Sequence, residues 1–79
     1  MKYIIFDERY PVIFPVFLSH DEVARLYEYK GIGKPTSAGF IRLNSSGKKL
    51  FPHGKSISLN LQSRAEDASI INRLLDPIQ

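Results

Sequence analysis

Tyr3-Ile4-Ile5-Phe6 is an uninterrupted apolar run near the start of a chain of 79 residues. A strand with one wet face alternates apolar and polar residues, whereas a run without alternation is typical of a strand that is buried on both faces. We therefore expect residues 3–6 to form a strand that is covered on both sides. A second subunit is one candidate for part of that cover.

The residues after this run predict a hairpin. Val12–Phe14 is a second apolar run, and Pro11 and Pro15 stand on either side of it. Proline cannot donate a hydrogen bond to a β-ladder, so this strand should be short and should lie at an edge of its sheet. Asp7–Tyr10 then forms the connection between the two strands.

Two helices are predicted by one repeated spacing of serine and glutamate. Ser19 and Glu22 have the spacing of a capping box, in which each side chain bonds the backbone amide of the other residue. The helix that follows should end near Gly31, because glycine readily adopts the left-handed conformation of a C-terminal cap. Ser63 and Glu66 repeat the spacing and predict the start of a second helix.

The chain between the two helices predicts strands. Residues 39–44 form one of them, and residues 50–51 form a short optional one. Residues 55–61 alternate cleanly, which is the pattern of a strand with one dry face and one wet face. The expected dry face holds Ile57, Leu59 and Leu61, and the wet face holds Ser56, Ser58 and Asn60.

Together these elements predict a single small α+β domain over residues 1–79. Its order along the chain is β-β-α-β-(β)-β-α, with about four to five strands in a mostly antiparallel sheet and both helices packed on one face. A more separated pair of β-β-α halves is the alternative. A domain this short hides only about 60% of the surface of its unfolded chain, so we expect a homo-oligomer to add stability.

Positive charge is concentrated in the middle of the chain. The net charge is +3, and no acidic residue occurs from Tyr29 to Ala65. That segment holds seven cations, which are Lys30, Lys34, Arg42, Lys48, Lys49, Lys55 and Arg64. A segregated field can steer an anionic partner even when the net charge is small. The preferred partner is therefore nucleic acid or another polyanion, and an acidic protein is a further candidate.

One face of the predicted sheet suits such a partner. If Ile41 and Leu43 face the core, then Phe40, Arg42 and Asn44 face outward. An aromatic ring beside cationic groups is how sheet-based proteins bind single-stranded nucleic acid. The candidate nucleic-acid or anion-binding residues are Phe40, Arg42, Lys48, Lys49, His53, Lys55 and Arg64. The opposite parity of the strand and an ordinary solvated face with a lysine-rich turn are the alternatives.

The rival hypothesis is a protein-interaction or oligomerising accessory protein with an aromatic interface. The chain holds four tyrosines and five phenylalanines, which a thin core cannot easily hide. Excess aromatic surface marks interfaces. The residues expected at that interface are Tyr3, Phe6 and Phe14, with Phe40 as a further candidate.

Several functional classes find no support in the sequence. The absence of cysteine excludes disulfides and thiolate metal sites and favours the cytoplasm. The N-terminal apolar run is too short for a signal peptide or a membrane span, so we expect no membrane partner. His20 and His53 lack further ligands at metal spacing, and we expect both to be exposed. Since no catalytic motif is present, we predict neither an enzyme nor a cofactor.

Overall fold

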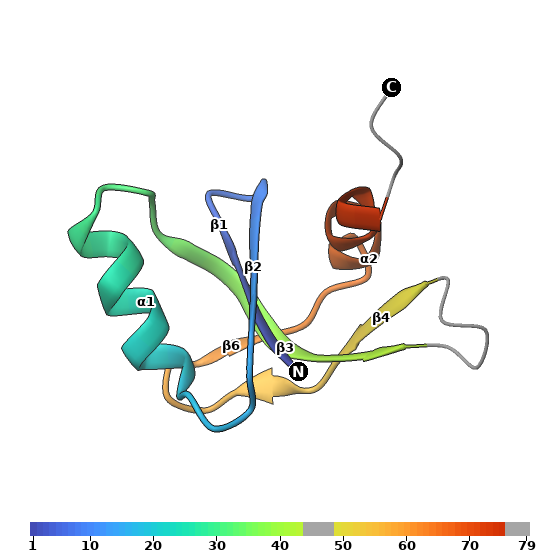
Figure 1. The fold of residues 1–79 in the computed structure, drawn as a ribbon, viewed down its shortest axis with the longest axis horizontal. Coiled ribbons are helices and arrows are strands. Elements are labelled where there is room, and N and C mark those ends of the chain that lie inside the picture. The colour runs from blue at the N-terminus through green and yellow to red at the C-terminus, as the bar shows by residue number, and fades with distance from the viewer. Residues whose placement is uncertain (44–48, 76–79) are drawn as a thin grey trace.

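The computed structural model describes residues 1–43 and 49–75 (Figure 1). Its elements in chain order are β1 (Lys2–Phe6), β2 (Tyr10–Phe14), α1 (His20–Tyr29), β3 (Pro35–Leu43), β4 (Leu50–His53), β5 (Lys55–Ser56), β6 (Leu61–Gln62), α2 (Asp67–Asn72) and a 3₁₀ turn (Arg73–Leu75). The predicted α+β class is confirmed, and the predicted order fits apart from one additional strand. None of the helices in the described residues has the length and apolar character that crossing a bilayer requires.

The main sheet is antiparallel and has the order β2-β1-β3-β4. β1 pairs with β2 through a hairpin and with β3 on its other side, with Ile5 opposite Pro11 and Ile4 opposite Ala38. The edge position predicted for the strand with flanking prolines is confirmed. β5 and β6 form a separate two-stranded sheet. Because β1 pairs directly with β3, the chain does not divide into two β-β-α halves.

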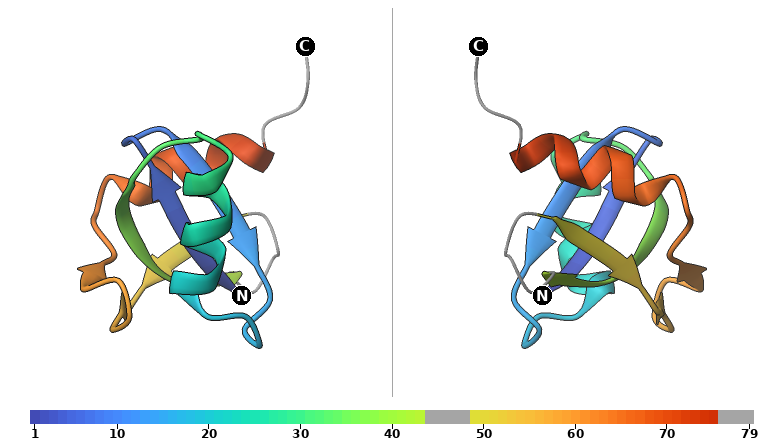
Figure 2. Two further views of the ribbon diagram at one scale, coloured as in Figure 1. Left: turned by 90° about the vertical axis from the view of Figure 1, so that its left-hand side faces the viewer. Right: turned by 90° about the vertical axis from the view of Figure 1, so that its right-hand side faces the viewer.

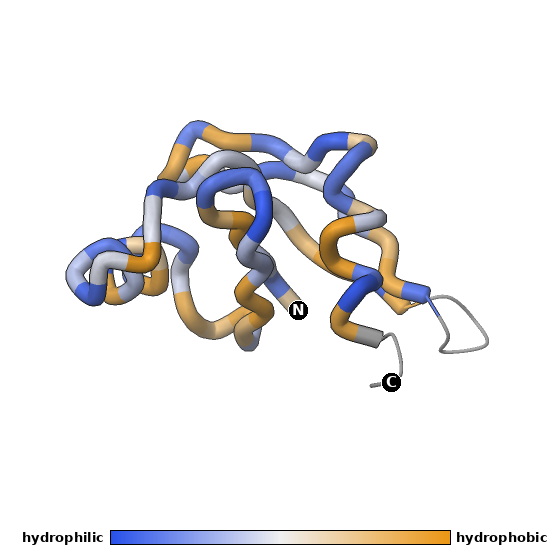
Figure 3. Tube along the Cα trace, turned by 90° about the horizontal axis from the view of Figure 1, so that it is seen from above, coloured by the Kyte–Doolittle hydropathy of each residue, from blue (hydrophilic) through white to orange (hydrophobic). Residues whose placement is uncertain are grey.

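β1 is buried on both faces. Ile4 and Phe6 belong to an apolar cluster with α1, whereas Tyr3 and Ile5 belong to a second cluster with α2. All four side chains are fully buried. The two helices therefore lie on opposite faces of the sheet, as Figures 1 and 2 show. The view from above in Figure 3 repeats this arrangement, with hydrophobic residues in orange along the strands between the helices.

The predicted packing of both helices on one face is thus wrong. A run without alternation carries apolar side chains on both sides of the pleat, and each side needs its own cover. α2 supplies the second cover, in place of a second subunit. The predicted interface residues Tyr3, Phe6 and Phe14 are likewise corrected, because all three are buried in the core of the chain itself.

The predicted start of α1 is confirmed. The Ser19 hydroxyl accepts a hydrogen bond from the amide of Glu22 (3.3 Å), and Glu22 Oε1 accepts one from the amide of Ser19 (3.4 Å). Asp21 and Glu22 also place negative charge at the positive end of the helix dipole. After the C-cap Lys30, Gly31 has a φ of 76°, which is the left-handed conformation expected there.

The predicted serine cap of the second helix is wrong. α2 begins at Asp67, and its N-cap Glu66 has helical backbone angles and no side-chain cap. The carboxylate of Asp67 accepts a hydrogen bond from the amide of Arg64 (3.0 Å), so this side chain organises the approach to the helix. Ser63 has the right spacing, but two residues in a turn separate Arg64 from the helix.

The single strand predicted over residues 55–61 is also wrong. The hydroxyl of the buried Ser56 accepts a hydrogen bond from the amide of Leu59 (3.3 Å), which closes a turn after only two residues of strand. Asn60 has a φ of 55°, and asparagine tolerates this left-handed conformation better than most residues. Ile57 is consequently 85% exposed, while Leu59 and Leu61 are half-buried against the α1 cluster.

Replacing Ser19 with alanine should lower the free energy of unfolding by about 1 kcal/mol, because both bonds of the capping box are lost. Chemical denaturation measures this change. Ser69→Ala is the matched control, since Ser69 is exposed within α2 and, among residues 1–43 and 49–75, its hydroxyl bonds only the carbonyl of Glu66. We expect the control to stay within about 0.5 kcal/mol of the wild type. Equal midpoints for Ser19→Ala and the wild type would contradict the role of the cap.

Candidate functional site

Two rows of paired residues bring cations and aromatic rings onto one face of the main sheet. Lys2 of β1 pairs with Phe40 of β3, and Phe40 pairs with His53 of β4. The neighbouring row pairs Arg42 of β3 with Phe51 of β4. Residues paired across strands point to the same side of a sheet, as do residues two apart along a strand. We call these five residues the aromatic–cationic face.

This face lies on the α1 side of the sheet. Lys2 lies two residues before Ile4 and four before Phe6, which pack under the helix, so all three share one side of β1. Arg42 and His53 are exposed, Phe51 is 41% exposed, and Phe40 is half-buried. Arg42 of β3 and Phe51 and His53 of β4 are thus accessible to a ligand.

The ring of Phe40 has neighbours on several sides. Its centroid lies 6.1 Å from that of the His53 ring, with the two planes 26° apart. The ring of His20 meets it edge-on at 5.8 Å, and Lys2 Nζ lies 5.9 Å from its centroid. Lys2 Nζ also donates a hydrogen bond to the carbonyl of Leu18 (2.8 Å). Because His53 is exposed, the Phe40–His53 stack continues to the protein surface.

His20 is buried, contrary to the predicted exposure of this first-turn histidine. Its side chain enters the sheet face between Phe14 and Phe40, and its Nε2 lies 2.9 Å from the carbonyl oxygen of Gly39. A carbonyl only accepts, so Nε2 carries the proton of this hydrogen bond. Burial lowers the pKa of His20, and the charge of Lys2 acts in the same direction against the opposing hydrogen bond to Gly39. The ring therefore favours its neutral form and packs between Phe14 and Phe40, beneath the aromatic–cationic face.

A groove of about 430 Å³ adjoins the aromatic–cationic face. Its walls carry two ammonium groups, a phenyl ring, an imidazole and three hydroxyls, from Lys2, Lys55, Phe40, His20, Ser19, Ser56 and Ser58. Gly54 has a φ of 76° and turns the chain from β4 into β5, where Lys55 lies. A Cβ atom at Gly54 would lie 3.2 Å from the Phe40 ring, so the absence of a side chain lets the turn pass close to the face. Among the described residues, no carboxylate lines this groove.

A second polar cluster lies on the α2 side of the sheet and is sealed from solvent. The carboxylate of Asp67 is 0% exposed. Its Oδ2 accepts hydrogen bonds from the Tyr3 hydroxyl (2.5 Å) and the Arg64 amide (3.0 Å), and its Oδ1 accepts one from the Ser37 hydroxyl (2.9 Å). Burial, together with the bond to Asp67, raises the pKa of the Tyr3 phenol above its ordinary value. A neutral phenol without access to solvent serves the structure of the core.

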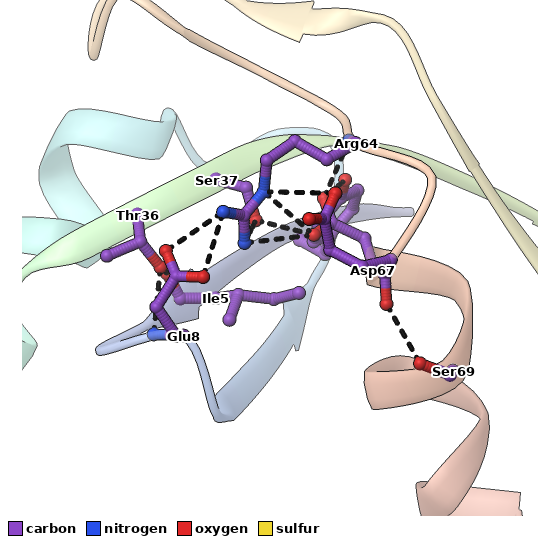
Figure 4. Close-up of polar contacts among 9 residues, drawn as sticks. Ile5, Glu8, Thr36, Ser37, Arg64, Asp67 and Ser69 are labelled. Atoms are coloured by element: carbon purple, nitrogen blue, oxygen red, sulfur yellow. Dashed lines mark hydrogen bonds and ion pairs between the residues drawn. The ribbon is translucent and has the colours of Figure 1, made fainter.

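Arg64 links this cluster to the surface (Figure 4). Its Nε donates to Asp67 Oδ1 (3.3 Å), and its Nη1 donates to both carboxylate oxygens of Glu8 at 2.9 Å. The hydrogen bond to Glu8 and the nearby charge of Asp67 raise the pKa of the Arg64 guanidinium. Arg64 is thus hydrogen-bonded to two carboxylates and lies 3.9 Å from a third, that of Glu66, which corrects its predicted role as a contact for anions.

The structure brings part of the predicted site together. Ile41 is buried in the α2 cluster, so Phe40 and Arg42 have the predicted outward parity, although Leu43 is exposed. Phe40, Arg42 and His53 share the aromatic–cationic face, and Lys55 lines the adjoining groove. Lys49 is exposed directly before β4, whereas Lys48 and Asn44 lie outside the described residues. Within that described part, no three metal-ligating side chains gather as a metal site.

Sequence reasoning missed three residues that shape these sites. Lys2 lies outside the acid-free segment, although its spacing from Ile4 could have placed it on the same side of β1. The sequence predicts an exposed His20 and indicates no role for Asp67, since both lie near predicted helix N-termini, where polar residues are common. Their burial depends on partners such as Gly39 and Tyr3, which come from other elements, and no local pattern reveals it.

No protein-family model matches the chain, and no curated protein or solved structure is similar enough to count as a match.

Stability should fall as the pH is lowered below the ordinary pKa of histidine, about 6.5. The folded state disfavours protonation of His20, so near this pH the unfolded state binds more protons and acid favours unfolding. Urea denaturation at pH 7.5, 6.5 and 5.5 measures the effect. His20→Gln can keep a donor to the Gly39 carbonyl without titrating, and it should show a shallower dependence in this range. A dependence equal to that of the wild type would contradict this role of His20.

Replacing Asp67 with alanine should lower the free energy of unfolding by about 3 kcal/mol, because it leaves buried hydroxyls unpaired and removes a partner of Arg64. Glu66→Ala is the matched control, since this neighbouring carboxylate is exposed and lies 3.9 Å from Arg64. We expect the control to cost less than about 1 kcal/mol. Equal losses in the two variants, measured by denaturation, would contradict the structural role of Asp67.

Proposed function

We propose that this chain is a small non-enzymatic binding module of the cytoplasm that holds single-stranded nucleic acid on the aromatic–cationic face. The observation that carries the proposal is the row in which Lys2, Phe40 and His53 pair, next to the pair of Arg42 and Phe51. Single strands bind where bases stack on aromatic rings while cationic groups meet the phosphates. Both kinds of group alternate here on adjoining strands of one sheet. The cysteine-free sequence is in keeping with the cytoplasm.

The cations at this face are available to phosphates. Ion pairs within the described residues involve only Arg25 and Arg64 among the cations, so Arg42 and Lys55 have no carboxylate partner there. Lys2 contacts a neutral carbonyl and an aromatic ring. When such cations contact phosphates, they release counterions that are condensed on the nucleic acid, so the affinity falls as the salt concentration rises.

The aromatic rings favour a single strand over a duplex. Stacking of a base on an aromatic side chain contributes about 1–3 kcal/mol, but the bases of a duplex already stack on one another. Phe51 and His53 present rings at the surface, and the half-buried Phe40 supports His53 from beneath. An unstacked base can reach these rings without opening a helix.

A protein interface is the second candidate, and it would use a different surface. Val16 and Phe17, in the loop between β2 and α1, are 58% and 81% exposed. Adjacent exposed apolar residues are frequent at interfaces. A homo-oligomer formed through this loop would use residues outside the aromatic–cationic face, although the loop adjoins that face where the carbonyl of Leu18 accepts a hydrogen bond from Lys2 Nζ.

Labelled single-stranded and duplex oligonucleotides, titrated at low salt, test the proposed function. We expect the single strand to bind more tightly, with a slope of log K against log salt of about −0.7 for each phosphate contacted. Arg42→Glu should weaken binding and make the slope shallower. Lys30→Glu carries the same change of charge on an exposed residue at the C-terminal end of α1, far from β4 in Figure 1, and should bind nearly as the wild type does.

The aromatic contribution has its own pair of variants. Phe51→Ala should weaken binding of the single strand by about 1–3 kcal/mol without changing the salt slope. Tyr29→Ala removes a ring that is even more exposed but lies at the end of α1, and it should have no effect. Equal effects of the paired variants, or no binding by the wild type at tens of micromolar, would refute the proposal. Circular dichroism verifies that each variant is folded.

A further inference from the structure

A second hollow continues from the groove beyond β5. It has a volume of about 530 Å³, and Lys55, Ser56 and Ile57 line both depressions. The turn after β5 and the strand β6 contribute Asn60 and Gln62 to the second one. A nucleic-acid strand that leaves the aromatic–cationic face along Lys55 therefore reaches this hollow without leaving the protein surface.

The hollow presents carboxamides that have no partner in the described residues. Gln62 pairs with Lys55 across β5 and β6, so the two side chains share one side of the small sheet. The side chains of Gln62 and Asn60 are exposed and make no hydrogen bond within the described part of the chain. A carboxamide offers a donor and an acceptor side by side, which suits the edge of a nucleobase.

The guanidinium in this hollow is not available for the same task. Arg64 also lines it, but its nitrogen atoms bond to Glu8, Asp67 and Ser37. Arginine is the residue that most often reads guanine, whereas asparagine and glutamine pair in bidentate fashion with adenine. With Arg64 already bonded, the polar groups that line the hollow without a partner in the described residues are Lys55 and the two amides. Lysine can contact guanine or a phosphate, and we assign Lys55 to the phosphate, which leaves the amides to read the base.

We propose that the hollow beside β6 is a base-reading site that prefers adenine. Gln62 pairs with the edge of the base, and Lys55 on the neighbouring strand holds the adjoining phosphate. The side chain of Ile57, which lines both depressions, packs against the base. This inference rests on the proposed function, because it describes what one part of the same bound strand does. Single strands leave the required base edges unpaired, so the reading needs no opening of a duplex.

Fluorescence anisotropy with labelled oligo(dA), oligo(dC) and oligo(dT) of equal length tests the inference. We expect the wild type to bind oligo(dA) about tenfold more tightly than oligo(dT), within the range for one bidentate contact. Gln62→Ala should bring that ratio close to one while the salt dependence stays the same, because no phosphate contact is lost. Gln62→Glu should shift the preference toward oligo(dC), since a carboxylate accepts from the amino group of cytosine. Lys55→Ala is the complementary control, because it should reduce the salt dependence and keep the base preference.

The outcomes separate this inference from the function on which it depends. If the wild type binds all three oligonucleotides equally, or if Gln62→Ala keeps the preference for oligo(dA), the base-reading site is overturned and the binding module stands. If the wild type binds none of them, the proposed function fails and this inference fails with it. Asn60→Gly removes the second amide and keeps the left-handed turn, so a preference that disappears only in this variant overturns the role of Gln62.

Discussion

The buried carboxylate of Asp67 is the interaction on which the rest of the structure depends. A charge without solvent must be matched by hydrogen bonds or by an opposite charge, and Asp67 has both. Its partners Tyr3 and Ser37 come from β1 and β3, so the start of α2 is bound to the middle of the sheet. In this position α2 covers the face of β1 that carries Tyr3 and Ile5. The aromatic–cationic face lies on the opposite side of the sheet, which α1 covers in part.

The accessible face exists because α1 covers only part of its side of the sheet. Under the helix the side chains are apolar, as at Ile4 and Phe6, whereas the same side carries Lys2 and Phe40 one row farther along. His20 lies at the boundary, where its imidazole contacts the rings of Phe14 and Phe40. A larger helix would have buried these rings as core. The short one leaves them beside cations, where they are accessible to a flat ligand.

The sequence predicts the local features of this fold better than the distant ones. The capping box at Ser19 involves neighbours in the chain, and the burial of Tyr3–Phe6 on both faces follows from an apolar run without alternation, so both predictions hold. Which helix covers which face depends on contacts across the chain, and that prediction failed. Residues 55–61 failed for a local reason, since the side chains of Ser56 and Asn60 stabilise a turn that an alternating pattern does not reveal.

In the candidate site, too, local features were predicted better than contacts between residues that are distant in sequence. The outward parity of Phe40 follows from the burial of Ile41, and strand pairing adds His53 to it, as the pattern suggested. The acid-free segment predicted Arg42 and Lys55 as contacts for an anion, and neither has a carboxylate partner within the described residues. It failed at Arg64, because Glu8 and Asp67 are distant in sequence and return to it in the fold. Charge segregation along a chain survives folding only where the pairing of elements keeps the opposite charges away.

The two covers of β1 differ in the sequence separation of the contacts that hold them. The hairpin and α1 are close in sequence and can form early, but the bond from Tyr3 to Asp67 closes a loop of 64 residues. Contacts over such separations slow folding, since the chain must lose the entropy of closing the loop before it gains their energy. Until α2 docks, one side of a strongly apolar strand stays open to solvent and to other chains. Docking of α2 therefore removes an apolar surface on which incompletely folded chains could associate.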